Sequence, residues 1–314
     1  MRFKKPKFWD LKKPNFISKL LLPFTLPIII NNILLNFKSK KKIQNIKTIC
    51  IGNIYIGGTG KTPTTIKLYK ILKNMKFNVV TAKKNYTNQK DEKIILQNKT
   101  NFISDKTRKK IIKQAIYNKN DLIIFDDGLQ DKNVNYDIQL VCFDFNNWIG
   151  NGCLIPAGPL REKLDSLKKY DGIFLKNTAH KDENINNLIK NYNSNIEIFN
   201  THYEIVNLDR FSKSNKYLIF SGIGNPNDFK NILIQNNINI VDEMIFPDHY
   251  MYNEKDINLI KNRAKSINAK IITTEKDYVK IKEFDNGEIK FLEVNLKIEN
   301  EEKLIKFLKS KLDL

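Results

Sequence analysis

The chain has 314 residues, enough for two domains with separate hydrophobic cores, and its 41% hydrophobic content excludes an intrinsically disordered protein. The formal net charge of +20 favours an anionic partner such as nucleic acid, an acidic membrane or a phosphorylated substrate, or else reflects a compositional bias towards Lys, Asn and Ile. Three cysteines, Cys50, Cys142 and Cys153, lack metal-ligand spacing and cannot all pair with one another, which favours a reducing, cytosolic compartment.

The N-terminal segment is basic and aromatic at first and then becomes apolar. Residues 2–13 carry six Lys and Arg residues, and FISKLLLPFTLPIIINNILLNF follows from Phe16 to Phe37. A secretory signal is disfavoured because no small-residue cleavage site follows, and a spanning helix is disfavoured because Lys19 and two prolines interrupt the run. A helix packed on the domain remains an alternative. We expect residues 1–42 to form an interfacial membrane anchor, with the lysines and Trp9 at the level of anionic headgroups.

A glycine-rich turn follows a strand-like run in ICIGNIYIGGTGKTPTTIKLYKIL. Glycines allow backbone N–H groups to approach phosphate oxygens, and the N-terminus of the following helix attracts anions. Lys61 would then reach the β- and γ-phosphates of a nucleotide, and Thr62 would bind Mg²⁺. The alternative is an ordinary strand–helix turn. The usual first glycine is replaced by Tyr55, as in the variant loops of ParA-like nucleotidases, but Ile56 replaces the lysine that is usual in those proteins.

A second strand-like run ends in two carboxylates, in DLIIFDDGLQD. In a parallel sheet its carboxyl end would lie at the nucleotide site. Asp126 is therefore the expected second Mg²⁺ ligand, and Asp127 could orient the metal shell or a substrate hydroxyl. The alternative is a strand followed by a solvated Asp-Gly turn.

Strand-like and helical runs alternate along the rest of the chain. This pattern predicts an α/β protein with a P-loop NTPase-like, mainly parallel sheet domain, a second, smaller α/β domain and the N-terminal membrane-associating helix. NIEIFNTHYEIVNL predicts two extended strands in a linker, and a final helix from about Asn300 is expected to close the second α/β domain. The predicted boundaries are 1–42 for the anchor, 43–194 for the P-loop domain, 195–208 for the linker and 209–314 for the C-terminal domain.

Six motifs occur in an order that resembles the tetraacyldisaccharide 4'-kinase family: IGNIYIGGTGKTP, FDDGLQ, NGCLIPAGPLRE, FSGIGNPNDF, FPDHY and TTEKD. The resemblance implies a kinase that uses ATP and Mg²⁺ to phosphorylate the 4'-hydroxyl of the lipid A disaccharide 1-phosphate precursor. It implies an enzyme on the cytoplasmic face of the inner membrane, peripheral or monotopic on an anionic lipid surface. It also implies two α/β domains with the active site in the cleft between them.

The resemblance also implies roles for particular residues. Asp91 matches the catalytic base, His249 the histidine that supports it, and Lys61 the catalytic lysine of the loop. The implied metal ligands are Thr62, Asp126, Asp127 and Glu162. The implied ATP-binding residues are Tyr55, Ile56, Gly57, Gly58, Thr59, Gly60, Lys61 and Thr62. Weaker candidates are Arg161, Lys276 and Asp277. The alternatives are a solvated loop for Asp91, a surface loop for Glu162 and a structural role for His249.

The sequence departs from the family pattern in two places. The usual S-R-G-Y-G is replaced at residues 83–87, where Lys84 stands at the arginine position, and a lysine cannot reproduce a bidentate guanidinium contact. Asp131 stands where the family usually has histidine. An inactive ATP-binding relative and a membrane-associated ParA-like nucleotide switch therefore remain alternatives. No nucleic-acid partner is expected, because no recognised binding motif accompanies the positive charge.

Overall fold

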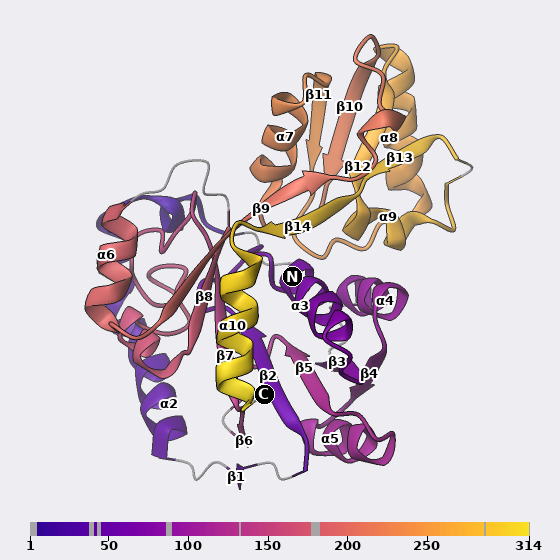
Figure 1. Ribbon diagram of the computed structural model, residues 1–314. Helices are drawn as coiled ribbons and strands as arrows, with labels where there is room; N and C mark the ends of the chain where they lie inside the picture. Colours follow the sequence, from indigo (N-terminus) through magenta and orange to yellow (C-terminus); the bar gives the residue numbers. More distant parts are fainter. Residues whose placement is uncertain are drawn as a thin grey trace. The chain divides into compact units, whose positions relative to one another are not determined.

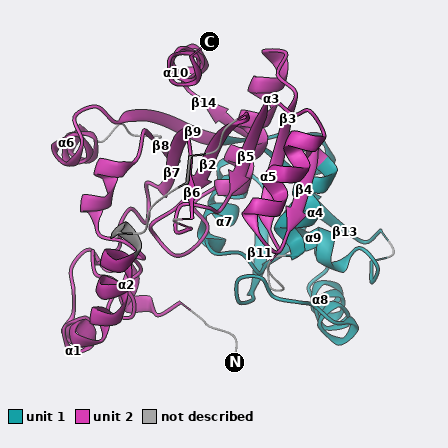
Figure 2. Ribbon diagram, turned by 90° about the horizontal axis from the view of Figure 1, so that it is seen from below, with its two compact units in different colours: residues 1–4, 86–98, 203–295 teal, residues 5–85, 99–202, 296–314 magenta. Residues whose placement is uncertain are grey.

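The computed structural model describes residues 5–37, 41–42, 45–85, 90–131, 133–176, 183–285 and 287–313 (Figure 1). The chain divides into two compact units, which Figure 2 shows in teal and magenta. Unit 1 comprises residues 1–4, 86–98 and 203–295, and unit 2 comprises residues 5–85, 99–202 and 296–314. Tyr86 and Thr87, which belong to the segment that departs from the family pattern, lie outside the described residues.

An eight-stranded sheet forms the centre of unit 2 (Figure 1). Its order is β14 (Val294–Ile298), β9 (Glu197–Ile205), β8 (Gly172–Lys176), β7 (Ile138–Asp144), β2 (Lys47–Gly52), β5 (Leu122–Asp126), β3 (Val79–Lys84) and β4 (Phe102–Asp105). Every neighbouring pair from β9 to β4 is parallel. A short pair, β1 (Lys41–Lys42) and β6 (Val134–Asn135), lies apart from this sheet. The predicted mainly parallel sheet is confirmed.

Helices cover both faces of this sheet, which is why inner strands such as β5 and β8 are buried along their whole length rather than at alternate residues. Ile49 and Ile51 of β2 face a core that also contains residues of α3 (Lys61–Asn74) and α10 (Glu301–Leu312). Cys50, between them, faces the opposite core, to which α5 (Arg108–Tyr117), η3 (Leu164–Lys169) and α6 (Glu183–Tyr192) contribute. The successive side chains of β2 therefore serve two separate cores, as strand geometry requires.

The last helix, α10, packs in unit 2, whereas the sequence places it with the C-terminal domain. Leu304, Leu308 and Leu312 recur every four residues and are buried with Ile138 and Leu140 of β7. Through this apolar stripe, α10 packs in the same core of unit 2 as Ile49 and Ile51 of β2. The compact units consequently differ from the predicted consecutive boundaries at 43–194, 195–208 and 209–314. The predicted two extended strands of the linker are instead one strand, β9, followed by the short η4 (Leu208–Arg210).

Unit 1 contains a smaller, four-stranded parallel sheet. Its order is β11 (Asn239–Ile245), β10 (Lys216–Ser221), β12 (Lys270–Thr274) and β13 (Ile289–Leu292). Residues of α7 (Pro226–Gln235) pack with one set of strand residues, and residues of α8 (Glu254–Ser266) and α9 (Glu275–Ile281) pack with the alternate set. The helix α4 (Lys90–Lys99) brings residues 90–98 into this unit. The predicted second, smaller α/β domain is confirmed.

The N-terminal segment forms four short helical pieces: η1 (Lys7–Asp10), α1 (Phe16–Leu21), η2 (Leu22–Thr25) and α2 (Leu26–Phe37). The helical run Phe16–Leu34 is long and apolar enough to cross a membrane by length and composition, and little of it is buried. Trp9 differs from the expectation that it lies among headgroups. Its ring is buried, and its Nε1–H donates to the carbonyl oxygen of Pro156 at 3.0 Å.

Candidate active site

The phosphate loop joins the end of β2 to the start of α3. Gly57 and Gly60 adopt positive φ angles of 127° and 85°, which side chains disfavour, so these two turns require glycine. In the first turn of α3, the N–H of Thr64 donates a hydrogen bond to the carbonyl oxygen of Gly60 at 3.0 Å. The helix begins at Lys61 and its N-terminus follows directly from the glycine turn. This arrangement combines backbone donors with a helix dipole and can bind phosphate groups.

Tyr55 and Ile56 form hydrogen bonds with other residues of unit 2. Tyr55 is buried beside Leu160, and its hydroxyl donates to Asp10 Oδ1 at 2.5 Å. Burial first, and then the carboxylate of Asp10, raise the pKa of Tyr55, so it remains a neutral donor. The N–H of Ile56 donates to the carbonyl oxygen of Pro159 at 2.9 Å. These contacts hold the two residues just before the glycines, and a role for Tyr55 and Ile56 in ATP binding stays a prediction.

Asp126 and Thr62 come together as the sequence predicts. Asp126 is the last residue of β5 and lies in register with Ile51 of β2, just before the loop. Thr62 Oγ1 donates to Asp126 Oδ2 at 3.1 Å, and Thr65 Oγ1 lies 3.4 Å from the other carboxylate oxygen. A hydroxyl and a carboxylate are the hard oxygen ligands that Mg²⁺ prefers. The donor chemistry of this pair therefore fits a magnesium ion.

Lys83, which the sequence analysis did not identify as a site residue, contacts the carboxylate of Asp126. The register of β3 with β5 pairs Ala82 with Phe125, so the next residue of β3, Lys83, comes beside Asp126. Its Nζ lies 2.8 Å from Asp126 Oδ2, and both side chains are almost completely buried. The available signal was its position at the carboxyl end of a strand in a parallel sheet, where site residues gather.

Asp127 connects the loop lysine with two arginines. It has a positive φ of 61°, and its Oδ1 lies 3.8 Å from Lys61 Nζ and 3.6 Å from Arg161 Nη1. Its carbonyl oxygen accepts a hydrogen bond from Arg108 Nη2 at 2.9 Å, and Arg108 also forms an ion pair with Asp131. Burial alone would raise the pKa of Asp131, but the guanidinium outweighs it and the pKa lies below its ordinary value. Asp131 thus supports Asp127 through Arg108.

Glu162 has different contacts from the other predicted metal ligands. It is buried, accepts from Gln130 Nε2 at 3.2 Å and accepts from the hydroxyl of Tyr170 at 3.2 Å. Within the described ranges, no group of three or more His, Cys, Asp and Glu residues is arranged to hold a metal ion. Of the four predicted ligands, Thr62 and Asp126 are the two joined by direct contact. Two protein ligands suffice for Mg²⁺ at a phosphate loop, where waters and phosphate oxygens complete the shell.

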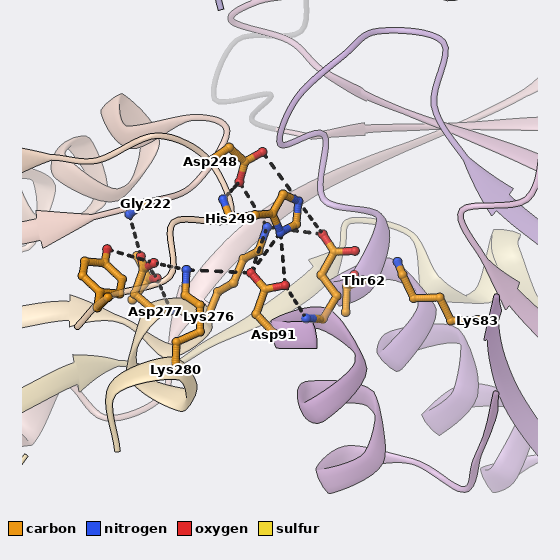
Figure 3. Close-up of polar contacts among 12 residues, drawn as sticks. Thr62, Lys83, Asp91, Gly222, Asp248, His249, Lys276, Asp277 and Lys280 are labelled. Carbon is orange, nitrogen blue, oxygen red and sulfur yellow. Dashed lines mark hydrogen bonds and ion pairs between the residues drawn. The ribbon is translucent and has the colours of Figure 1, made fainter. Parts of the chain in front are cut away.

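Unit 1 brings together the predicted base and its histidine. Asp91 lies in the first turn of α4, and His249 lies in the loop after β11 with a positive φ of 57°. His249 Nδ1 is 3.0 Å from Asp91 Oδ2 and 3.1 Å from Oδ1, and Figure 3 shows the two side chains pointing toward one another. Burial would raise the pKa of Asp91, but the hydrogen bond from His249 and the charge of Lys276 outweigh it and lower the pKa. The buried Asp91 is therefore ionised at neutral pH and can accept a proton.

Two lysines one turn apart on α9 surround this carboxylate (Figure 3). Lys276 Nζ lies 3.8 Å from Asp91 Oδ2 and 3.3 Å from carboxylate oxygens of Glu92 and Asp248. Burial would lower the pKa of Lys276, but these carboxylates raise it above its ordinary value. Lys280 Nζ is also 3.8 Å from Asp91 Oδ2. The weak candidate Lys276 is thus part of the base cluster, and Lys280 is a member that the sequence did not reveal.

Asp277 organises the loops around this cluster. It is completely buried and accepts from the N–H of Gly222 at 2.9 Å, the hydroxyl of Tyr252 at 3.1 Å and Thr274 Oγ1 at 2.8 Å. The N–H of His249 donates to the carbonyl oxygen of Gly222 at 3.1 Å. Asp277 therefore sets the backbone that carries the histidine, and its carboxylate Oδ1 lies 2.6 Å from Lys280 Nζ.

Comparison with known proteins shows the family to which the whole chain is similar. Residues 18–313 match the model of the LpxK family, tetraacyldisaccharide-1-P 4'-kinase. The tetraacyldisaccharide 4'-kinase of Pelagibacter ubique is 45% identical over 306 residues, which are 97% of this chain and 96% of that protein. The enzyme of the same name from Rickettsia canadensis is 37% identical over 94% of this chain and 93% of its own length.

A solved structure shares the fold. The crystal structure of the "apo" form of LpxK from Aquifex aeolicus in complex with ATP has a TM-score of 0.70 at 22% sequence identity, over 94% of this chain and 99% of that one. The likeness extends over nearly all of both chains, and the family model covers all but the first 17 residues and the last. By sequence and by fold, this chain belongs to the tetraacyldisaccharide-1-P 4'-kinase family.

Proposed function

We propose that the chain transfers the γ-phosphoryl group of ATP to the 4'-hydroxyl of the tetraacylated glucosamine disaccharide 1-phosphate. In this reaction the bond between Pγ and the β,γ-bridging oxygen breaks, and a bond from Pγ to the sugar oxygen forms. ADP leaves, and the hydroxyl proton passes to a base. The transfer requires that a phosphate-binding loop and a base act on the same pair of substrates.

The contact between Asp91 and His249 is the single observation that carries this assignment. Asp91 is buried, its pKa is lowered and its carboxylate is held by an imidazole nitrogen at 3.0 Å. These properties support Asp91 as the base that accepts the hydroxyl proton, with His249 orienting the carboxylate. A switch protein that only binds and hydrolyses a nucleotide has no need for a base that activates a sugar hydroxyl.

The loop supplies the groups that would act on ATP. Lys61 would place its ammonium against the transferring phosphate, and the N–H groups that follow Gly57 would bind the remaining phosphate oxygens. Asp127 holds Lys61 at 3.8 Å and Arg161 at 3.6 Å, so it positions both cations. Thr62 and Asp126 would hold Mg²⁺, which when bound neutralises charge on the β- and γ-phosphates. Glu162, which accepts a hydrogen bond from Gln130, would contact the water molecules that coordinate Mg²⁺.

The N-terminal helices support a peripheral or monotopic location on an anionic membrane, which we assign to the cytoplasmic face of the inner membrane. Phe16 is 79% exposed, and Phe24 and Leu34 are 64% and 62% exposed. Large apolar side chains exposed along a helical run are typical of interfacial anchors. A tetraacylated substrate resides in such a membrane, so the anchor would bring the enzyme to it.

The test is phosphate transfer from radiolabelled ATP to the disaccharide 1-phosphate in mixed micelles. We expect transfer by the unaltered protein, and a loss of about 10²–10⁴-fold in kcat for Asp91→Asn with ATP binding retained. Arg210→Gln, at an exposed position in η4 of the same unit, is the control and is expected to remain active.

Two results would contradict the proposed activity, and a third would contradict only the assignment of the base. The first is ATP binding without transfer to the disaccharide, which would indicate an inactive relative. The second is ATP-driven dimerisation without lipid phosphorylation, which would indicate a nucleotide switch. The third is full activity in Asp91→Asn, which would remove the base assignment but leave the kinase activity.

A further inference from the structure

The carboxylate of Asp126 already has a cationic partner inside the protein. Lys83 Nζ is 2.8 Å from Asp126 Oδ2, the oxygen that also accepts from Thr62 Oγ1 at 3.1 Å. The side chain of Lys83 is 3% exposed and that of Asp126 is 0% exposed. Neither side chain can therefore break this ion pair and become solvated unless the phosphate loop or β3 moves.

A buried ion pair of this kind is costly unless its geometry serves a purpose. Desolvation of two charges offsets much of their attraction, so such pairs contribute little stability compared with an apolar pair. Removing one partner, however, leaves an uncompensated buried charge, which is strongly destabilising. The ammonium of Lys83 supplies the positive charge that the buried Asp126 needs.

We propose that Lys83 is a positioning residue whose ammonium group holds the Asp126 carboxylate before nucleotide binds, and competes with Mg²⁺ for that carboxylate afterwards. The proposal rests on the proposed function, because it takes Thr62 and Asp126 as the magnesium ligands. A dication and an ammonium cannot both take the same oxygen at contact distance without strong repulsion. Lys83 thus raises the Mg²⁺ concentration that the enzyme needs.

The strand register explains why this lysine and not a neighbour has the role. β3 and β5 are adjacent and parallel, and the pair Ala82–Phe125 places Lys83 beside Asp126 at the carboxyl edge of the sheet. Side chains alternate along a strand, so Lys84 projects to the opposite face of β3 from Lys83. A charge at position 83 therefore acts on the metal carboxylate, whereas a charge at position 84 does not share that environment.

The chain offers a matched control in the same sheet. Lys176, at the end of β8, lies 2.8 Å from Asp144 Oδ2 at the end of β7, and these side chains are 5% and 1% exposed. This pair has the same chemistry, length and burial as the pair of Lys83 and Asp126. Lys176→Met therefore reproduces the loss of a buried ion pair at this sheet edge without removing a contact to Asp126.

The experiment compares Lys83→Met, Lys83→Gln, Lys176→Met, Asp126→Asn and the unaltered protein. Each is titrated with Mg²⁺ at fixed concentrations of a fluorescent, non-hydrolysable ATP analogue, and nucleotide binding and thermal unfolding are followed. We expect Lys83→Met to need at least about tenfold less Mg²⁺ for half-maximal binding, because a repelling charge at contact distance is gone. Its Tm should also rise more on addition of Mg²⁺, because the ion then compensates Asp126.

The glutamine variant covers the case in which Lys83→Met does not fold, because it keeps an N–H donor for Asp126 and removes only the charge. It should shift the Mg²⁺ midpoint in the same direction. Lys176→Met should lose stability with an unchanged midpoint. A midpoint for both position-83 variants equal to that of the unaltered protein would overturn the inference.

Two further outcomes separate the possible failures. If nucleotide affinity falls by the same factor with and without Mg²⁺, Lys83 is a phosphate ligand and does not compete with the metal. If Asp126→Asn leaves the Mg²⁺ dependence unchanged, the assignment of Asp126 as a metal ligand fails, and the inference fails with it. If Asp126→Asn abolishes the dependence while the Lys83 variants match the unaltered protein, only the inference fails.

Discussion

The imidazole of His249 lies 3.0 Å from the carboxylate of Asp91, although 158 residues separate them in the chain. The two come from different kinds of element, since Asp91 belongs to the first turn of α4 and His249 to a loop with positive φ. Four charged or titratable side chains surround Asp91: His249, Glu92, Lys276 and Lys280. The properties of the proposed base therefore depend on this cluster as a whole.

The first prediction concerns the pH dependence of the base. Burial raises the pKa of Asp91, and the hydrogen bond from His249 and the charge of Lys276 together lower it below its ordinary value. Lys276→Met removes one of the two compensating effects, so the pKa of Asp91 should rise. The acidic limb of the kcat/KM profile should then move to higher pH.

The same substitution should change acid stability in a defined direction. A carboxylate with a depressed folded-state pKa contributes stability above its unfolded pKa and loses it as the pH falls through the folded value. In Lys276→Met this loss should begin at a higher pH than in the unaltered protein. Lys282→Met, at the end of the same helix and exposed, is the control. Identical pH profiles for Lys276→Met and the control would contradict the role of Lys276.

The second prediction concerns the loop lysine. Lys61→Ala removes a positive charge that lies 3.8 Å from Asp127 at the start of α3 and that we expect at the transferring phosphate. The value of kcat should fall by about 10²–10³-fold, as for other preorganised groups that stabilise developing charge. Lys67→Ala serves for comparison, because Lys67 is on the same helix but pairs with Glu301 at 2.6 Å. Equal activities of the two variants would exclude Lys61 from catalysis.

The third prediction concerns the membrane. Phe16 and Phe24 of the N-terminal helices are 79% and 64% exposed, so the double variant Phe16→Ser, Phe24→Ser should bind anionic vesicles less tightly. Burial of one large apolar side chain contributes about 1.5–3 kcal/mol, which corresponds to roughly tenfold or more for each residue. Flotation with vesicles of phosphatidylglycerol and phosphatidylethanolamine measures this. Ile234→Ser with Leu259→Ser removes comparably exposed apolar side chains of unit 1 and should leave vesicle binding unchanged.

The fourth prediction tests how the N-terminal segment is attached to unit 2. Gly150 has φ +57°, and a Cβ there would lie 2.1 Å from the carbonyl oxygen of Trp9 and 2.9 Å from Pro159 Cγ. Gly150→Ala should therefore displace the segment that carries Trp9. It should lose about 1–2 kcal/mol of unfolding free energy from backbone strain and about 1–3 kcal/mol more from the collision.

The matched control for this substitution is Gly287→Ala. Gly287 also has a positive φ, +91°, but a Cβ there would meet nothing within 4 Å. It should show the strain without the collision. Urea unfolding of both variants gives the comparison, and equal losses would mean that the contact between Gly150 and Trp9 does not restrain the segment.

Much of the fold and part of the site could be predicted because they are encoded locally. The glycine turn, Lys61 and Thr62 follow one strand and begin one helix, and Asp126 ends an apolar strand of a parallel sheet. In both cases the residues that matter are adjacent in the chain or at the carboxyl end of a strand. The pairing of Thr62 with Asp126 follows from placing these two strands side by side.

Other parts of the site could not be predicted because they depend on strand order and packing. Lys83 reaches Asp126 only because β3 is the neighbour of β5 and the register pairs Ala82 with Phe125. The stripe of leucines in α10 indicates an apolar face but not which core it covers. A periodic pattern indicates which side chains of a segment are buried, but only the tertiary structure shows which other segment they pack against. The amino-acid sequence thus specifies the nucleotide loop and its carboxylates and, by family resemblance, names Asp91 and His249. The lysines around Asp91 and the charge beside Asp126 arise from contacts between segments far apart in the chain.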